Sequence, residues 1–140
     1  MSFVAIGQQL KSILDTVKAT GVLADVYEYD SPSSDTWYPF ATITPRTANE
    51  TILDTASNQT VYKFIIRAVD INKDKVTMEE NMRTLADAIL AELRKESHET
   101  FGGTVDRVNP FILSFGWETA NQVPSRFFEI EIEVLKDYFI

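Results

Sequence analysis

An alternation of apolar and acidic residues near the C-terminus is the clearest pattern in the chain. Four apolar residues alternate there with three glutamates: Phe128, Ile130, Ile132 and Val134 with Glu129, Glu131 and Glu133. Successive side chains of a strand point to opposite faces, so this period of two predicts a strand with one face on a core. Carboxylates two residues apart on a strand lie ~6.7 Å from each other and repel. We therefore expect the acidic face to be wet, paired with cations or facing an aqueous channel.

Two other segments repeat apolar residues every three or four positions, as amphipathic helices do. The first covers about 3–19 and ends near Gly21, because glycine tolerates the left-handed conformation that terminates many helices. The second has Thr77 as its predicted N-cap, with Glu80 three positions later as the other half of a capping box. Its apolar face continues to Leu93, which predicts a helix of several turns.

Strand patterns fill most of the remaining chain. They predict four strands before the closing one, over about 24–29, 38–44, 59–69 and 110–118. With a last strand over about 126–140, the predicted order is α-β-β-β-α-β-β. We expect one α+β domain over 1–140, with a mainly antiparallel sheet of about five strands and both helices packed on one face.

The segment 46–58 joins two of these strands and is mostly small and polar. A mobile surface loop and a protruding hairpin that becomes ordered on a partner both fit this composition. Two adjacent apolar residues near its centre favour docking. The candidate residues for contact with another subunit or a tube are Arg46, Asn49, Ile52, Leu53 and Asn58.

Composition narrows the chemistry that the chain can perform. Of its 140 residues, 44% are hydrophobic and 11% aromatic, as in a globular protein, and the formal net charge is −8. Such a charge argues against tight wrapping of nucleic acid. The chain has no cysteine and one histidine, so the common zinc ligand sets and cysteine nucleophiles are excluded. Residues 1–9 lack a basic region followed by an apolar run, so we expect no secretory signal there. No apolar stretch approaches the ~20 residues that span a bilayer.

No catalytic, cofactor-binding or metal site is predicted from these residues. His98 lies in a polar stretch, and the five glycines form no phosphate-binding loop. Glu129, Glu131 and Glu133 could hold a hard cation only with ligands from elsewhere, because carboxylates along one strand do not converge. A small ligand- or metal-binding α+β domain that uses this acidic face is the alternative function. Trp117 is expected to anchor a core or an interface, since few basic residues surround it.

In order, size and character of its elements, the chain resembles the tail terminator or tail completion proteins of long-tailed bacteriophages and related tail-like particles. The resemblance covers two helical segments, two strands and the closing acidic strand: 4–18, 79–95, the proline-bracketed 38–45, 61–69 and 126–140. These families share no catalytic signature, so no residue role is carried over by motif.

The resemblance implies an α+β subunit that forms a ring, usually of six chains, at the head-proximal end of the tail tube. There the ring would stop tube polymerisation and provide the surface for head–tail joining. The implied partners are further copies of the chain, the tail-tube protein and a head-completion or neck protein, while DNA passes without specific binding. The implied location is the virion, after synthesis in the host cytoplasm. Two alternatives stay open: the chain could serve in the neighbouring neck instead of as a terminator, and the tail could be contractile or non-contractile.

Within such a ring, the glutamates at 129, 131 and 133 are expected near the lumen, where they would repel passing DNA. The segment 46–58 is expected in contacts with neighbouring subunits or the tube. Six chains of charge −8 repel one another, so these contacts must be strong enough to hold the ring together.

Overall fold

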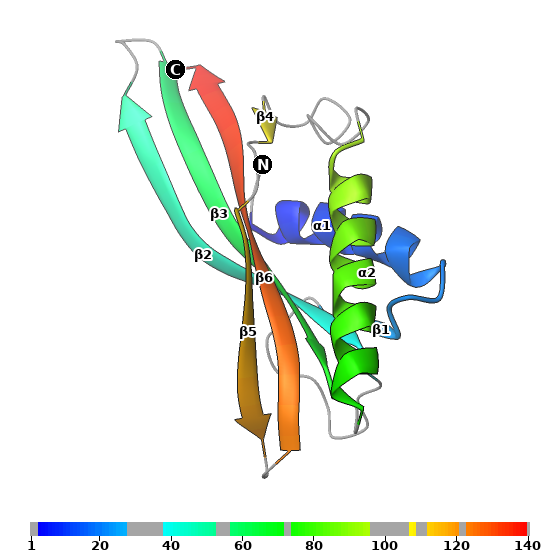
Figure 1. Ribbon diagram of the computed structural model, residues 1–140. Coiled ribbons are helices and arrows are strands. Elements are labelled where there is room, and N and C mark those ends of the chain that lie inside the picture. Colours follow the sequence, from blue (N-terminus) through cyan, green and yellow to red (C-terminus); the bar gives the residue numbers. More distant parts are fainter. Residues whose placement is uncertain are drawn as a thin grey trace.

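The computed structural model describes residues 3–27, 38–52, 57–71, 74–95, 107–108, 112–120 and 123–139. Two crossing helices cover one face of a twisted sheet, and three strands of that sheet continue well beyond them (Figure 1). The elements in chain order are α1 Phe3–Lys18, β1 Asp25–Tyr27, β2 Phe40–Ile52, β3 Ser57–Asp70, α2 Lys75–Leu93, β4 Arg107–Val108, β5 Ile112–Ala120 and β6 Val123–Phe139. The predicted α+β class, the element order and the placement of both helices on one face are confirmed.

The sheet is mixed, with its strands in the order β1-β2-β3-β6-β4 and with β5 also paired to β6. Only β1 and β2 run parallel among the described strands; the other pairs are antiparallel. Strand β6 pairs with β3 along its whole length, while its other edge holds β5 near its start and β4 near its end. Strand β4 has two residues, too few to show a period, which is why the sequence does not predict it.

Helix α1 follows its sequence pattern closely. Its sheet-facing side chains are buried, and Gly21 follows the helix with a φ of 88°. This left-handed conformation is the one expected of a glycine that ends a helix. The buried residues of α1 are Ile6, Leu10, Ile13, Leu14 and Val17.

Helix α2 begins earlier than predicted, because its N-cap is Asp74 and not Thr77. Asp74 Oδ1 accepts hydrogen bonds from the backbone N–H groups of Val76 and Thr77, at 3.0 and 3.3 Å. Its Oδ2 accepts one from the Thr77 hydroxyl at 2.9 Å, and this bond is the main reason that the pKa of Asp74 is lowered. The capping-box prediction was wrong because the carboxylate three residues upstream already accepts hydrogen bonds from two free N–H groups of the first turn.

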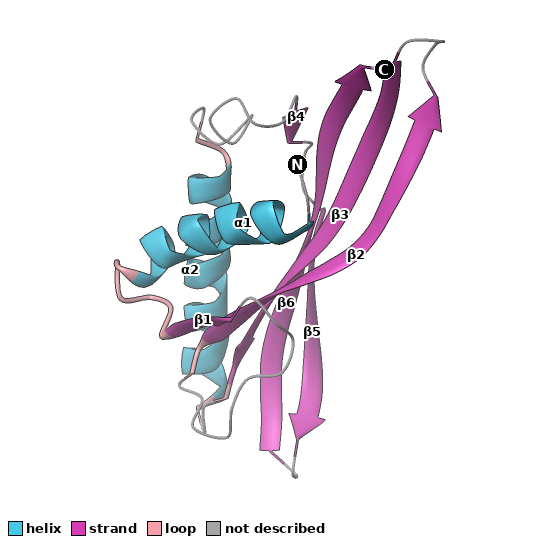
Figure 2. Cartoon of the chain, turned by 180° about the vertical axis from the view of Figure 1, so that it is seen from behind, coloured by secondary structure: helices cyan, strands magenta, loops and turns pink. Residues whose placement is uncertain are grey.

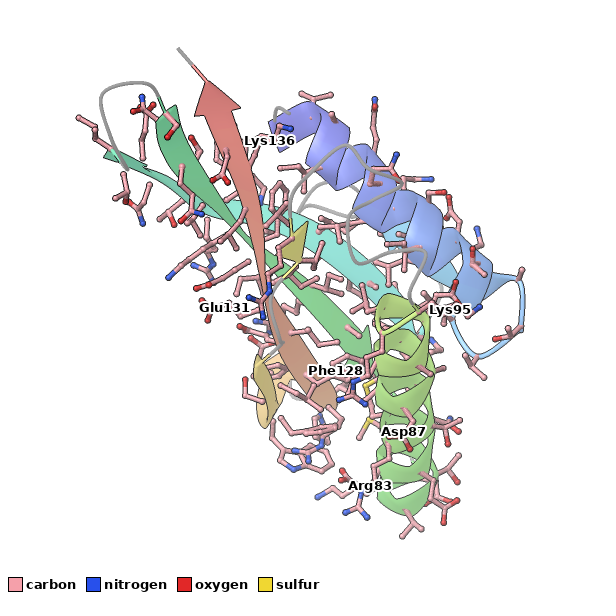
Figure 3. All side chains as sticks on the ribbon, turned by 90° about the horizontal axis from the view of Figure 1, so that it is seen from above. Arg83, Asp87, Lys95, Phe128, Glu131 and Lys136 are labelled. Atoms are coloured by element: carbon pink, nitrogen blue, oxygen red, sulfur yellow. The ribbon has the colours of Figure 1, made fainter. Side chains whose placement is uncertain are left out.

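The core lies between the two helices and the inner face of the sheet. Alternate residues of β3 and β6 point into it, as the period of two predicted, and Phe128 points toward α2 (Figure 3). Helix α2 contributes one buried stripe: Met78, Met82, Leu85, Ala86, Ile89, Leu90 and Leu93. The sheet contributes the opposite wall: Ala41, Ile43, Tyr62, Phe64, Ile66, Ala68, Phe128, Ile130, Ile132 and Val134.

Candidate functional site

The predicted acidic row lies on the outer face of the sheet, on the side away from both helices. Glu129, Glu131 and Glu133 are all partly exposed there, and Figure 3 shows Glu131 on the opposite side of β6 from α2. This placement follows from strand geometry, because the residues between these glutamates are the ones that pack into the core.

Two cations of β3 lie beside this row and pair with it. The antiparallel register puts Arg67 opposite Glu129 and Lys63 opposite Glu133. Arg67 Nη1 lies 3.1 Å from Glu129 Oε1, and Lys63 Nζ lies 3.4 Å from Glu133 Oε1. Lys63 Nζ is also 3.9 Å from Glu131 Oε1. The cross-strand cations therefore offset the repulsion between neighbouring carboxylates.

Arg67 is the centre of a larger cluster on this face. Its Nη2 lies 2.6 Å from Glu118 Oε2 on β5, and its guanidinium carbon lies 4.2 Å from the centre of the Phe127 ring. That ring fits because position 116 is glycine: a Cβ on Gly116 would lie 2.5 Å from Phe127 Cζ. Each partly exposed ion pair is worth ~1 kcal/mol or less, so the cluster orders this face more than it stabilises the fold.

The chemistry of the outer face is that of a charged, ordered surface. Four carboxylates, with Glu118 as the fourth, face two cations there, which leaves an excess of negative charge. In the part of the chain that the structure describes, no three acidic or histidine side chains converge as metal ligands would. In the sequence, Lys63 and Arg67 interrupt the otherwise apolar alternation of Val61, Ile65 and Val69, whereas no such pattern singles out Glu118.

The second predicted contact region is mostly strand rather than loop. Strand β2 continues to Ile52 and β3 begins at Ser57, so the two strands form a long hairpin that reaches past the helices, with β6 beside it (Figure 2). We call this three-stranded extension the arm; it comprises 45–52, 57–61 and 135–139. The helix layer stops just below it, where the Phe3 ring of α1 lies 5.2 Å from the ring of Tyr62.

The predicted contact residues occupy distinct positions on the arm. Arg46 lies at a shift in strand register, and Asn49 pairs with Val61 farther along. Ile52 is 77% exposed near the end of the arm, opposite Asn58, whose Nδ2 donates a hydrogen bond to Glu50. Leu53 lies outside the described residues. The arm therefore brings Ile52 and Asn58 together at its end, while Arg46 lies near its base.

The free edge of β2 is a further feature of the arm. Strand β1 pairs with β2 only at 40–42, so the rest of this edge has no strand partner within the described residues. Pro45 has no N–H to donate and lies on this stretch, where a proline costs little. The unpaired backbone groups and the exposed side chains make the arm available to another chain.

A buried carboxylate at the end of β3 was not singled out from the sequence. Asp70 is buried and accepts hydrogen bonds from the Ile71 backbone N–H and the Asn81 side chain, while its Oδ2 has no hydrogen-bond partner among the described residues. Burial disfavours the charged form, so the pKa of Asp70 is raised above its usual 3.8. A raised pKa in the folded state means that Asp70 favours folding when protonated and costs stability once ionised.

Replacing Asp70 with asparagine is therefore expected to raise the melting temperature at pH 7. The gain should shrink as the pH falls toward 3.8, because the parent carboxyl then becomes protonated in the folded state and afterwards in the unfolded state. Thermal unfolding of the parent and Asp70→Asn between pH 3 and pH 8 measures this difference. An unchanged difference across that range would show that the charge of Asp70 does not destabilise the fold.

Comparisons with known proteins find similarities among solved structures, where 31 chains match. No family model matches the chain, and no curated protein matches it. One similar solved structure is a chain of a "Virion of native gene transfer agent (GTA) particle", with 11% identity and a TM-score of 0.47. The match covers 92% of this chain and 84% of the other. Neither described helix combines the length and apolar character needed to cross a bilayer.

Proposed function

We propose that this chain is a structural protein of a phage-like virion, of the tail terminator or tail completion type. In this proposal copies of the chain form a ring, of six subunits as is usual in those families, at the head-proximal end of the tail tube. The ring caps the tube, stops its polymerisation and offers its other side to a head-completion or neck protein. The chain acts by assembly and not by catalysis.

The arm is the observation that carries this proposal. Three strands of the sheet extend beyond the helices that cover the rest of it, and 45–52 are exposed along their whole length. Ordered strands with so little cover of their own favour a subunit that completes its packing against other chains. Because the sequence resembles ring-forming tail proteins, we infer that the arm makes its contacts within a ring.

The outer sheet face fits the wall of a DNA channel in this proposal. Glu129, Glu131 and Glu133 keep an excess of negative charge on the face even after pairing with Lys63 and Arg67. A surface of this sign repels a passing polyanion and does not hold it. The same ion pairs account for the acidic row without a ligand or metal, so no observation now favours the alternative of a small binding domain.

Assembly with tail-tube protein tests the proposed function directly. We expect the parent chain to form discrete rings, alone or on tubes, and to shorten or stop tube growth when added to polymerising tube protein. Light scattering after size-exclusion chromatography gives the ring mass, and negative-stain images give the position of the ring on the tube. A chain that stays monomeric, binds no tube and leaves the tube length unchanged would contradict the proposed function.

A further inference from the structure

A hollow of about 490 Å³ lies at the opposite end of the molecule from the arm, between the first turns of α2 and the hairpin of β5 and β6. Its floor and walls include Val76 and Glu79 from the helix and Trp117 and Arg126 from the strands, with Lys75 at the rim. We call it the groove. Val76 and Trp117 supply its apolar side chains, while the other lining residues are charged: Lys75, Glu79, Glu80, Arg83 and Arg126.

Arg126 orders the aromatic wall of the groove. Its Nε lies 2.7 Å from Glu79 Oε2, and its Nη2 donates a hydrogen bond to Glu79 Oε1 at 3.2 Å. Its guanidinium carbon also lies 4.9 Å from the centre of the Trp117 ring and 5.1 Å from that of Phe115. The two rings are thus held in place by a cation that is itself held by α2, so the groove is preformed.

Three large apolar side chains are exposed at or beside the groove. Trp117 is 49% exposed and Val76 is 68% exposed, and Phe115 beside them is also exposed. Clustered apolar side chains of this kind mark a surface that contacts another molecule, with aromatic residues as typical anchors. The partner should therefore offer at least one exposed aliphatic side chain.

The end of the arm offers such a side chain with matching charge. Ile52 is 77% exposed, and Glu50 lies two residues earlier, on the same face of β2. At the rim of the groove, Lys75 is exposed and has no ion pair among the described side chains. The groove is lined by three cations, Lys75, Arg83 and Arg126, and by two anions, Glu79 and Glu80. This net positive charge favours an acidic partner, which Glu50 supplies.

We propose that the arm of one subunit docks in the groove of the next, with Ile52 against Trp117 and Val76 and with Glu50 near Lys75. The arm and the ends of α2, β5 and β6 that line the groove lie at opposite ends of the molecule (Figure 1). The contact is therefore head-to-tail and leaves one arm and one groove free on each pair. Contacts of this kind close into a ring when the rotation between neighbouring subunits divides a full turn and there is no rise along the axis. The inference rests on the proposed ring function and specifies the joint that holds the ring together.

Cysteine cross-linking tests the joint, because the chain has no cysteine of its own. We expect oxidation of an equal mixture of Ile52→Cys and Val76→Cys to give several-fold more covalent dimer than Ile52→Cys mixed with Ser12→Cys. Ser12 is an exposed residue of α1, a helix that contributes to neither the arm nor the groove, and it is the matched control. Equal cross-linking to Ser12 and Val76, or dimers of Ile52→Cys with itself as the main product, would overturn the inference.

A complementation experiment tests the same joint without covalent chemistry. Ile52→Asp damages the arm and Trp117→Ala damages the groove, and both positions are exposed, so both variants should fold. Each alone should lose the ring by light scattering, while their mixture should form dimers through the one intact arm and the one intact groove.

The outcomes separate this inference from the proposed function. If the parent forms rings but Ile52→Asp and Trp117→Ala assemble as the parent does, the joint is wrong and the ring function stands. A parent that neither forms rings nor caps tubes overturns both proposals. If the variants lose the ring but give no dimer on mixing, the head-to-tail contact is refuted, because the two damaged surfaces are then not complementary.

Discussion

Replacing Phe128 with alanine is expected to lower the free energy of unfolding by ~3–5 kcal/mol, the largest effect of any single change that we foresee. Phe128 is fully buried on the inner face of β6, and its ring lies 5.6 Å from the ring of Phe115. Truncation removes the buried apolar area of the ring and leaves a cavity between the sheet and α2. The surrounding side chains are tightly packed and can move only partly into that cavity. A domain is stable by ~5–15 kcal/mol in total, so the variant should be close to unfolding.

Urea denaturation followed by far-UV circular dichroism measures this loss. The matched control is Phe127→Ala, one residue earlier on the outer face, where the ring is partly exposed and supports Arg67. We expect that change to cost only about 1–2 kcal/mol, since less area is lost and no core cavity forms. Equal losses for the two variants would contradict the assignment of the two faces of β6.

Replacing Arg126 with methionine should have the second largest effect, a loss of ~2–4 kcal/mol. The side chain of Arg126 is 13% exposed, and it joins β6 to α2 through Glu79 while it packs against Trp117 and Phe115. Methionine keeps much of the aliphatic contact but leaves the Glu79 carboxylate without its best-buried cation. The measured loss therefore reports chiefly on the ion pair and the stacking.

Arg83→Met is the matched control for this prediction. Arg83 Nε also lies 3.0 Å from Glu79 Oε1, but its side chain is 71% exposed, so its loss should cost ~0.5 kcal/mol or less. A double-mutant cycle of Arg126→Met with Glu79→Gln should give a coupling energy of ~1–3 kcal/mol. Additive effects in that cycle, or equal losses at the two arginines, would show that the pair does not tie β6 to α2.

The same two residues connect stability to the proposed assembly. Phe128 packs behind Phe115, and Arg126 lies between Phe115 and Trp117, so both support the aromatic wall of the groove from inside. Their variants should weaken ring formation as well as folding. The exposed positions Ile52 and Trp117 are better probes of assembly, because changes there leave the core intact.

The helices and long strands were predictable because their signals are local. A period of two separated core and solvent faces along β6, and a period near 3.6 defined α1 and α2. Even Gly21 could be placed, since a positive φ at a helix end is a property of one residue. The error at Thr77 arose because Asp74 competes for the same N–H groups and the pattern alone does not rank the two caps.

Features that depend on contacts between distant segments were decided only in the tertiary structure. Arg67 meets Glu129 across 62 positions of sequence, and Arg126 meets Glu79 across 47. The register of β3 on β6 sets the first pair, and the packing of α2 on the sheet sets the second; neither leaves a trace in the local pattern.

The arm shows the same division. Its residues alone allowed a mobile loop or a hairpin, and only pairing with β3 and β6 extends β2 as far as Ile52. The sequence by itself thus determined which side chains of each element face the core. The tertiary structure decided which charged side chains pair, how far the sheet extends beyond the helices and where the groove forms. These features depend on strand pairing and packing between segments that are distant in the sequence.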